Sequence, residues 1–226
     1  MKIKINITFK IILVSVFSLF MSCQGNIAKN ITNQESKEEV ILSKGTFGYD
    51  KQFLTQHYKN TIVLENKAEQ SAILVSPELQ GRVMTSTLGG DNGKSFGWIN
   101  HDLIASKKIN PQFNAFGGEE RLWLGPEGGQ FSLYFQKGTT FDFENWKVPN
   151  MIDTEPFELL SKTKETAIFK KQKTLENYSG TTFTLEIRRT IKLLDKEAIK
   201  TRLKLKDTSI SVVAYNETVK AHCATS

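Results

Sequence analysis

Cysteine and histidine are scarce in this chain, which has two Cys and three His among 226 residues. Two Cys cannot form a disulfide framework or supply the four ligands of a cysteine zinc site. Positive charge is also modest. The formal net charge is +6, but three lysines lie in the first ten residues, and without them 27 basic side chains face 24 acidic ones. This balance does not indicate a nucleic-acid partner.

Apolar runs are short as well. The run Ile11–Met21 has 11 residues, whereas a transmembrane helix needs about 20. Lysines precede the run, so residues 1–22 are typical of a signal peptide. Ser22 and Cys23 follow and resemble a bacterial lipobox, which implies cleavage before Cys23, lipidation of its thiol and a lipid anchor in the bacterial cell envelope. The alternative is an ordinary signal peptide, in which case Cys23 is not lipidated.

The next segment is polar. Residues 24–44 are rich in Asn, Gln, Lys, Glu and Ser and have no apolar periodicity, so residues 23–45 are predicted to be the lipidated Cys and a flexible tether. The full sequence is 39% hydrophobic and has 15 Phe, enough for a core, which argues against wholesale disorder. We expect one β-sandwich domain over residues 46–215 and an irregular tail over residues 216–226.

Alternation of apolar and polar residues dominates after residue 60 and indicates β-strands. The clearest pattern is Thr182–Leu194, where Arg189 interrupts the apolar face. Leu194–Glu197 is expected to turn into a further strand over Ile199–Lys206, and one short helix is expected over Tyr49–Tyr58. The predicted fold class is mainly β, an antiparallel β-sandwich with one short N-terminal helix. Other expected strands are 61–64, 72–75, 82–88, 131–135, 157–160, 167–169 and 210–215.

Residues 114–130 differ from the rest of the chain because they hold five Gly, three Glu, an Arg and a Trp. On a strand, Arg121 and Trp123 would share one face. This pairing suits a sugar site, since an indole packs on the apolar face of a sugar ring while Arg and Glu bind its hydroxyls. A buried Arg–Glu pair that locks a loop, with Trp123 in the core, explains the same composition. Composition alone does not decide between the two.

Three segments carry a family resemblance: Gly81-Arg82-Val83, Gly97-Trp98-Ile99-Asn100, and the stretch from Gly117 to Glu127. They resemble the galactose-mutarotase-like (aldose 1-epimerase-like) superfamily, and within it the lipoproteins and secreted members of unknown function from Bacteroidota-type bacteria. The resemblance spans residues 45–215. It implies a β-supersandwich with a carbohydrate-binding cleft on its concave face.

The resemblance does not extend to a catalytic pair. Mutarotases use a general-acid His and a late general-base Glu, and neither can be placed here. His101 is near the candidate site, but we expect it to cap the following turn. The predicted function is carbohydrate binding without catalysis, cofactor or metal, and the alternative is an aldose 1-epimerase-type enzyme acting by general acid/base catalysis. The expected ligand contacts are Arg82, Trp98, Asn100, His101, Asn114, Glu119, Glu120, Arg121, Trp123 and Glu127.

Length suggests that the domain is incomplete. Without leader and tether about 180 residues remain, fewer than the supersandwich usually needs. The last residues, Lys220 to Ser226, show neither strand alternation nor a helical pattern. We therefore expect a C-terminally truncated member with open sheet edges, prone to aggregation.

Overall fold

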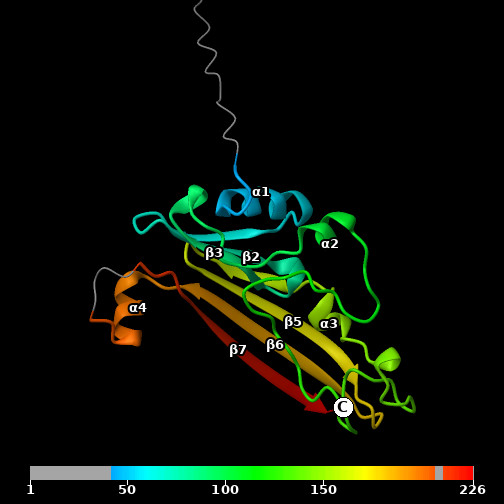
Figure 1. Cartoon of the computed structure of the whole chain (residues 1–226). Helices are drawn as coiled ribbons and strands as arrows, with labels where there is room; N and C mark the ends of the chain where they lie inside the picture. The colour runs from blue at the N-terminus through cyan, green and yellow to red at the C-terminus, as the bar shows by residue number, and fades with distance from the viewer. Residues whose placement is uncertain (1–41, 207–210, 226) are drawn as a thin grey trace, which may run out of the picture. The chain divides into compact units, whose positions relative to one another are not determined.

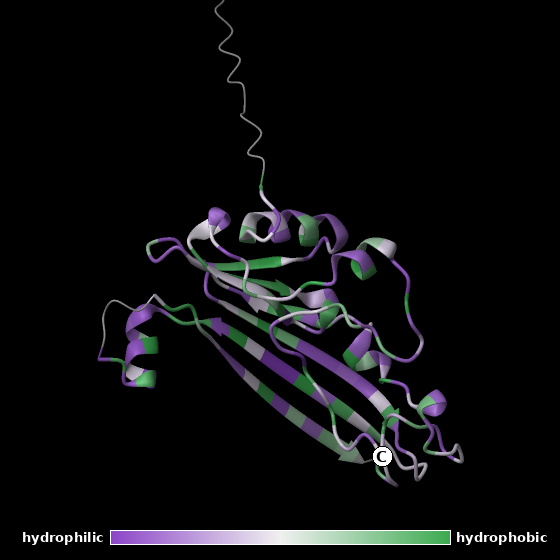
Figure 2. Ribbon diagram, in the orientation of Figure 1, coloured by the Kyte–Doolittle hydropathy of each residue, from purple (hydrophilic) through white to green (hydrophobic). Residues whose placement is uncertain are grey.

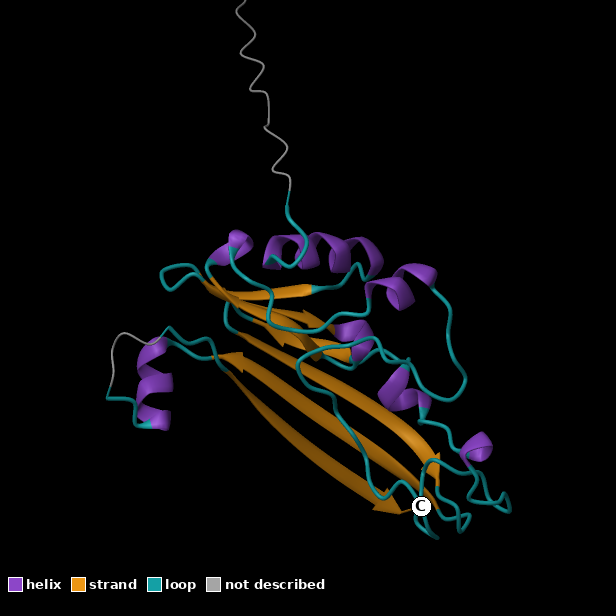
Figure 3. Ribbon diagram, viewed as in Figure 1, coloured by secondary structure: helices purple, strands orange, loops and turns teal. Residues whose placement is uncertain are grey.

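The computed structural model describes residues 42–206 and 211–225. The predicted signal peptide, Cys23 and the first part of the tether lie outside the described residues. Within the described part, no helix has both the length and the apolar character needed to cross a membrane. The chain is mainly β, with two antiparallel sheets and several short helices (Figures 1 and 3). The predicted β-sandwich is confirmed.

The first sheet has three strands in sequence order, β1 (Ile62–Asn66), β2 (Ser71–Ser76) and β3 (Arg82–Leu88). A tight connection joins β1 to β2, and Ser71 pairs with both Asn66 and Leu88. β2 is buried along its whole length, because one face meets the second sheet and the other meets helix α1. This explains why its sequence is apolar without strict alternation.

The second sheet has four strands, β4 (Glu158–Lys162), β5 (Thr166–Glu176), β6 (Thr182–Leu193) and β7 (Tyr215–Thr225), again in sequence order. β5 and β6 pair along their full length. Figure 2 shows hydrophobic and hydrophilic residues alternating along these long strands. That alternation buries one face against the first sheet and leaves the other in solvent.

The described part of the chain also forms four α-helices: α1 (Phe47–His57), α2 (His101–Ser106), α3 (Asn150–Asp153) and α4 (Lys196–Leu203). The helix predicted near the N-terminus is confirmed as α1, which begins after Thr46, whose side chain accepts a hydrogen bond from the Tyr49 amide. The expectation of a single helix is wrong, because three further short helices form in the connections. The 3-10 turns are η1 (Pro77–Leu79), η2 (Gly90–Asn92) and η3 (Phe143–Asn145).

Two apolar clusters hold the layers together. The larger lies between the sheets, where Val75 and Val83 of the first sheet meet Phe169 and Ile187 of the second. The smaller lies on the other face of the first sheet, under α1 and α2, and its fully buried members are Leu54, Leu74 and Met84. Removing such side chains from water is the main stabilising contribution to the fold, at about 25 cal/mol per Å² of apolar surface.

The strand predicted over Ile199–Lys206 is wrong, and so is the hairpin turn before it. The segment forms α4, and the Asp195 side chain caps it by accepting a hydrogen bond from the Ala198 amide at 2.7 Å. Ile199 and Leu203 are four residues apart, a spacing that places them on one face of a helix. The cap and this spacing outweigh the local alternation with lysines.

The tail predicted to be irregular, residues 216–226, is also corrected. Residues 215–225 form β7, which pairs with β6 from Leu193 opposite Tyr215 to Phe183 opposite Thr225. β7 is an edge strand, and its side chains from Thr218 to Ala224 are exposed. An edge strand with little burial needs no apolar alternation, so its sequence carries little strand signal.

The strand expected over residues 131–135 is a loop instead. It belongs to the long segment between α2 and β4 that Figure 3 shows mostly as loop. Ser132 donates its hydroxyl to the Glu127 carbonyl at 2.7 Å and its amide to the Gly129 carbonyl at 3.0 Å. These local bonds close a turn and replace a strand ladder. The strand expected over residues 210–215 does not form either: Ile210 lies outside the described residues, and 211–214 are irregular.

Candidate functional site

Two buried arginines join the sheets at the centre of the predicted site. Arg82 of β3 is 1% exposed, and it donates hydrogen bonds to the Gly117 carbonyl at 2.7 Å and to Gln80 Oε1 at 2.9 Å. Burial, and next the positive charge of Arg121, lower the pKa of Arg82 to about 10. The guanidinium is still protonated at neutral pH, and its donors are directed at protein groups.

Arg189 of β6 is fully buried and is held by two carboxylates. Its Nε lies 2.8 Å from Glu217 Oε1, and its guanidinium also forms an ion pair with Glu120. Glu120 in addition accepts a hydrogen bond from the Val83 amide at 2.8 Å. Burial raises the pKa of Glu217, and this effect exceeds the opposing influence of Arg189. Arg189, which interrupts the apolar face of its strand in the sequence, is therefore the centre of an ion-pair network.

Arg121 forms a second buried network. Its Nη2 lies 2.8 Å from Asp153 Oδ1, and Asn114 donates from Nδ2 to the other carboxylate oxygen of Asp153 at 2.8 Å. Asp153 and Asn114 are 2% and 1% exposed. The Arg121 guanidinium also lies 4.7 Å from the Phe113 ring centroid and 4.9 Å from that of Trp123. The alternative interpretation expected a buried Arg–Glu pair; the structure instead pairs the partly buried Arg121 with the buried Asp153.

Trp123 and Glu127 form a separate pair at the surface. The indole N–H of Trp123 donates to Glu127 Oε1 at 2.7 Å. The indole ring packs near Tyr134, with ring centroids 5.4 Å apart, while Arg121 approaches it as described. These neighbours leave little of the indole surface for a sugar ring. Glu127 itself is exposed.

Glu119 lies between the two sheets. Its Oε1 accepts a hydrogen bond from the Ser86 hydroxyl at 2.6 Å, and its amide donates to the Val83 carbonyl at 2.9 Å. Burial, followed by the nearby charge of Glu119, raises the pKa of Tyr215 well above its ordinary value. Glu119 thus links β3 to β7, with a protonated phenol beside it.

The glycines of the motifs let these segments approach one another. A Cβ on Gly118 would lie 2.6 Å from Arg82 Cδ, and Gly118 has a φ of +118°. A Cβ on Gly97 would lie 2.1 Å from the Met84 carbonyl oxygen. Both positions require glycine, for backbone conformation in one case and for close approach to β3 in the other. Their role is to seat the loops on the first sheet.

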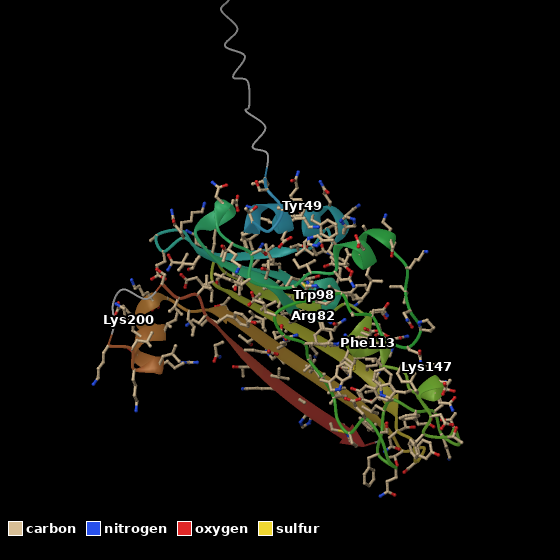
Figure 4. The ribbon with its side chains drawn as sticks, in the orientation of Figure 1. Tyr49, Arg82, Trp98, Phe113, Lys147 and Lys200 are labelled. Atoms are coloured by element: carbon tan, nitrogen blue, oxygen red, sulfur yellow. The ribbon has the colours of Figure 1, made fainter. Side chains whose placement is uncertain are left out.

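The remaining predicted residues line a pocket elsewhere. This tryptophan pocket has a volume of about 410 Å³ and is bordered by Lys44, Asp50, Trp98, Asn100 and His101. Trp98, labelled in Figure 4, is 61% exposed. Asn100 is the N-cap of α2, where its Oδ1 accepts from the Leu103 amide at 3.1 Å. The expectation that His101 caps this turn is therefore wrong, because Asn100 does so.

A hydrogen-bonded chain ends at His101. The Gly97 amide donates to Thr85 Oγ1 at 2.9 Å, and Thr85 Oγ1 lies 2.7 Å from Ser95 Oγ. Ser95 in turn donates to Asp50 Oδ2, and Asp50 Oδ1 lies 2.8 Å from His101 Nε2. Asp50 is 4% exposed. The carboxylate can only accept, so His101 Nε2 carries a proton and Nδ1 is the nitrogen left to exchange one.

The structure thus divides the ten predicted contacts among three places. Arg82, Asn114, Glu120 and Arg121 hold the sheets and loops together, as does Glu119, and each of them is hydrogen-bonded to protein groups. Trp123 and Glu127 pair at the surface. The third group, Trp98, Asn100 and His101, lines the tryptophan pocket. Sequence reasoning did not identify Asp50, Ser95, Asp153 and Glu217, which come from distant segments.

Within residues 42–206 and 211–225, no group of three or more His, Cys, Asp or Glu side chains is arranged to hold a metal ion. The chain belongs to the family of unknown function DUF6786, which matches residues 45–223. The match includes both sheets except the last two residues of β7, the ion-pair networks, and the residues of the tryptophan pocket other than Lys44. Neither a curated protein nor a solved structure matches the chain.

Proposed function

We propose that this chain is a lipoprotein of the bacterial cell envelope whose galactose-mutarotase-like β-sandwich binds carbohydrate in the tryptophan pocket. The observation that carries the proposal is the exposed indole of Trp98, which lines the same pocket as the buried Asp50 and the partly exposed His101. An exposed indole offers an apolar face for the C–H groups of a sugar ring. Lys44 at the border of the pocket can donate hydrogen bonds to sugar hydroxyls. Asp50 is buried and bound by Ser95 and His101, so its role is to hold the imidazole of His101 in place.

The dimensions of the pocket agree with a small saccharide. Pockets that hold small molecules have volumes of about 300–1,000 Å³, and this one has about 410 Å³. It is open to solvent and has both polar and apolar walls. The buried networks of Arg121 and Arg189 support the site indirectly, because they hold in place the loops that follow β3.

The experiment is a screen of the full chain against an immobilised array of hexose, N-acetylhexosamine and uronic-acid oligosaccharides. Binding that is lost in Trp98→Ala and in Asp50→Asn supports the proposal. Absence of binding to every glycan, by a protein that melts cooperatively, would sink it. Trp123→Phe should keep the binding, since Trp123 lies outside the pocket.

The Asp50–His101 pair favours the enzymatic alternative as a second candidate. A carboxylate that orients an imidazole is the usual arrangement of a general base, and it leaves Nδ1 to take a proton from a sugar hydroxyl. Polarimetry of freshly dissolved α-D-galactose tests this. Mutarotation above background that disappears in His101→Ala, but not in His57→Ala, supports an epimerase-type activity. An unchanged rate in His101→Ala removes this residue from the mechanism.

A further inference from the structure

A second cavity lies on the other side of α2. Helix α2 contributes His101 to the tryptophan pocket, and it contributes Leu103 and Ile104 to this second cavity, whose volume is about 300 Å³. We call it the apolar slot. Its walls come from the end of α1, from η1, from α2 and from the loops that carry Phe116 and Pro156. Five segments far apart in sequence thus converge on one cavity.

The interior of the slot is apolar. Leu79, Ile104 and Phe116 are 2%, 4% and 4% exposed and belong to the core under α1 and α2. Ile109 lies at the mouth and is 59% exposed. An apolar floor with an exposed aliphatic side chain at the entrance suits an alkyl chain, because binding removes the apolar surface of the chain and that of Ile109 from water.

The mouth of the slot is basic. Lys107 and Lys108 line it, are exposed, and have no ion-pair partner among the described residues. The lining also holds one carboxylate, Glu78, whose Oε1 accepts from the Asn60 amide at 3.1 Å and from Asn60 Nδ2 at 2.9 Å. These neutral donors leave its negative charge in place, so the two lysines stand against one carboxylate. Both cations stand at the entrance of an apolar cavity.

One further group in the lining is a hydrogen-bond donor. Burial raises the pKa of Tyr58 to about 12, so its hydroxyl keeps its proton at neutral pH. His57 also lines the slot, and its Nδ1 lies 2.9 Å from the Phe53 carbonyl, so Nδ1 carries the proton. Neither residue places a negative charge at the entrance.

We propose that the apolar slot binds a medium-chain fatty acid, with the alkyl chain between Leu79, Ile104 and Phe116 and the carboxylate at Lys107 and Lys108. The apolar walls account for the chain, and the two unpaired lysines account for the acid. A neutral alkyl ligand forms no ion pair with the lysines, and their positive charge repels an alkylammonium. The slot is separate from the tryptophan pocket, so this inference stands or falls independently of carbohydrate binding.

Photolabelling of the full chain in phospholipid nanodiscs tests the proposal. The probe is decanoate with a diazirine at its terminal carbon, and labelled peptides are identified by mass spectrometry after digestion. We expect the label on the peptides that contain Leu79, Ile104 or Phe116, and competition by excess decanoate but not by decanol. Labelling spread over the surface, or equal competition by decanol, overturns the proposal.

Charge reversal provides the second arm. Lys107→Glu with Lys108→Glu should weaken protection by decanoate about tenfold, since two exposed pairs contribute up to ~1 kcal/mol each and 1.4 kcal/mol is tenfold. Lys204→Glu is the matched control, because Lys107 and Lys204 both end a helix with a positive φ, 55° and 53°. An unchanged apparent affinity in the double variant, or an equal loss in the control, contradicts the assignment of the lysines.

Discussion

Arg82 and Arg189, which come from different sheets, bind the same residue. Arg82 Nη2 donates to Gln80 Oε1 at 2.9 Å, and Arg189 Nη1 donates to the Gln80 carbonyl at 3.0 Å. Gln80 reaches both because its φ is +66°. One residue between η1 and β3 therefore joins the two sheets through two buried cations, and the carboxylates of Glu120 and Glu217 balance the charge.

Removal of Arg189 should be severely destabilising. In Arg189→Met, Glu120 and Glu217 lose the cation between them, and breaking such a buried pair costs about 3–5 kcal/mol. Arg188→Met, on the exposed face of the same strand, should change the free energy of unfolding by less than about 0.5 kcal/mol. Urea denaturation followed by circular dichroism measures both. Equal stability of the two variants would show that the inter-sheet network contributes little.

The two glycines Gly118 and Gly128 should respond differently to the same substitution. Gly118→Ala places a methyl 2.6 Å from Arg82 Cδ at a φ of +118°, which should cost about 1–3 kcal/mol. Gly128 has open space around it and no positive φ, so Gly128→Ala should leave the melting temperature unchanged. A thermal melt of each variant decides. An unchanged melting temperature in Gly118→Ala would mean that the loop containing Gly118 does not pack on β3 as described.

Acid should weaken one surface network in a predictable way. Burial alone would raise the pKa of Glu155, but the hydrogen bonds and charges of Lys171 and Lys173 outweigh it and lower the pKa. Because the pKa of Glu155 is lower in the folded state, its contacts with Lys171 and Lys173 stabilise the protein at pH values above the ordinary pKa of 4.5. This contribution is lost as the pH falls through the folded-state pKa of Glu155. Glu155→Gln should therefore match the acid stability of the wild type and fall below it at neutral pH, by under about 1 kcal/mol. Urea titrations at several pH values measure the difference; parallel curves would contradict it.

Lipidation of Cys23 is a prediction from the sequence alone. The chain has only two cysteines, and Cys223 is an exposed free thiol on β7. Metabolic labelling with an alkyne-bearing palmitate in a bacterial host should mark the wild type and Cys223→Ser equally, and should not mark Cys23→Ser. Label retained in Cys23→Ser would disprove the lipid anchor. Two acyl chains hold a protein at a membrane far better than one.

Much of the fold could be predicted from the sequence, for a physical reason. β5 and β6 each have one buried and one exposed face, so apolar and polar residues alternate along their sequences. This alternation predicts a strand over Thr182–Leu194, and the structure has β6 at Thr182–Leu193. β7 could not be recognised, because it lies at the edge and is held by backbone pairing with β6. The sequence of α4 imitates a strand, because basic residues alternate with others between Ile199 and Leu205.

The site was harder to predict because its partners are distant in sequence. The motif indicated Arg121 and Trp123 as neighbours, but Asp153, which binds Arg121, follows 32 residues later. His101 and Asp50 are 51 residues apart. Arg189 on an apolar strand face was a visible signal of a buried ion pair, since a charge there must find a partner. Which partner it finds depends on the register of β6 against β7.

Calorimetric titration of the full chain with the array's strongest-binding oligosaccharide tests most directly whether the tryptophan pocket binds sugar. Trp98→Ala should weaken binding by about five- to thirtyfold, because it removes an indole that contributes on the order of 1–2 kcal/mol. Phe131→Ala is the control, since Phe131 is also 61% exposed but lies outside the pocket. Loss of affinity in Trp98→Ala with full affinity in Phe131→Ala is the predicted result. Undiminished affinity in Trp98→Ala would contradict the account.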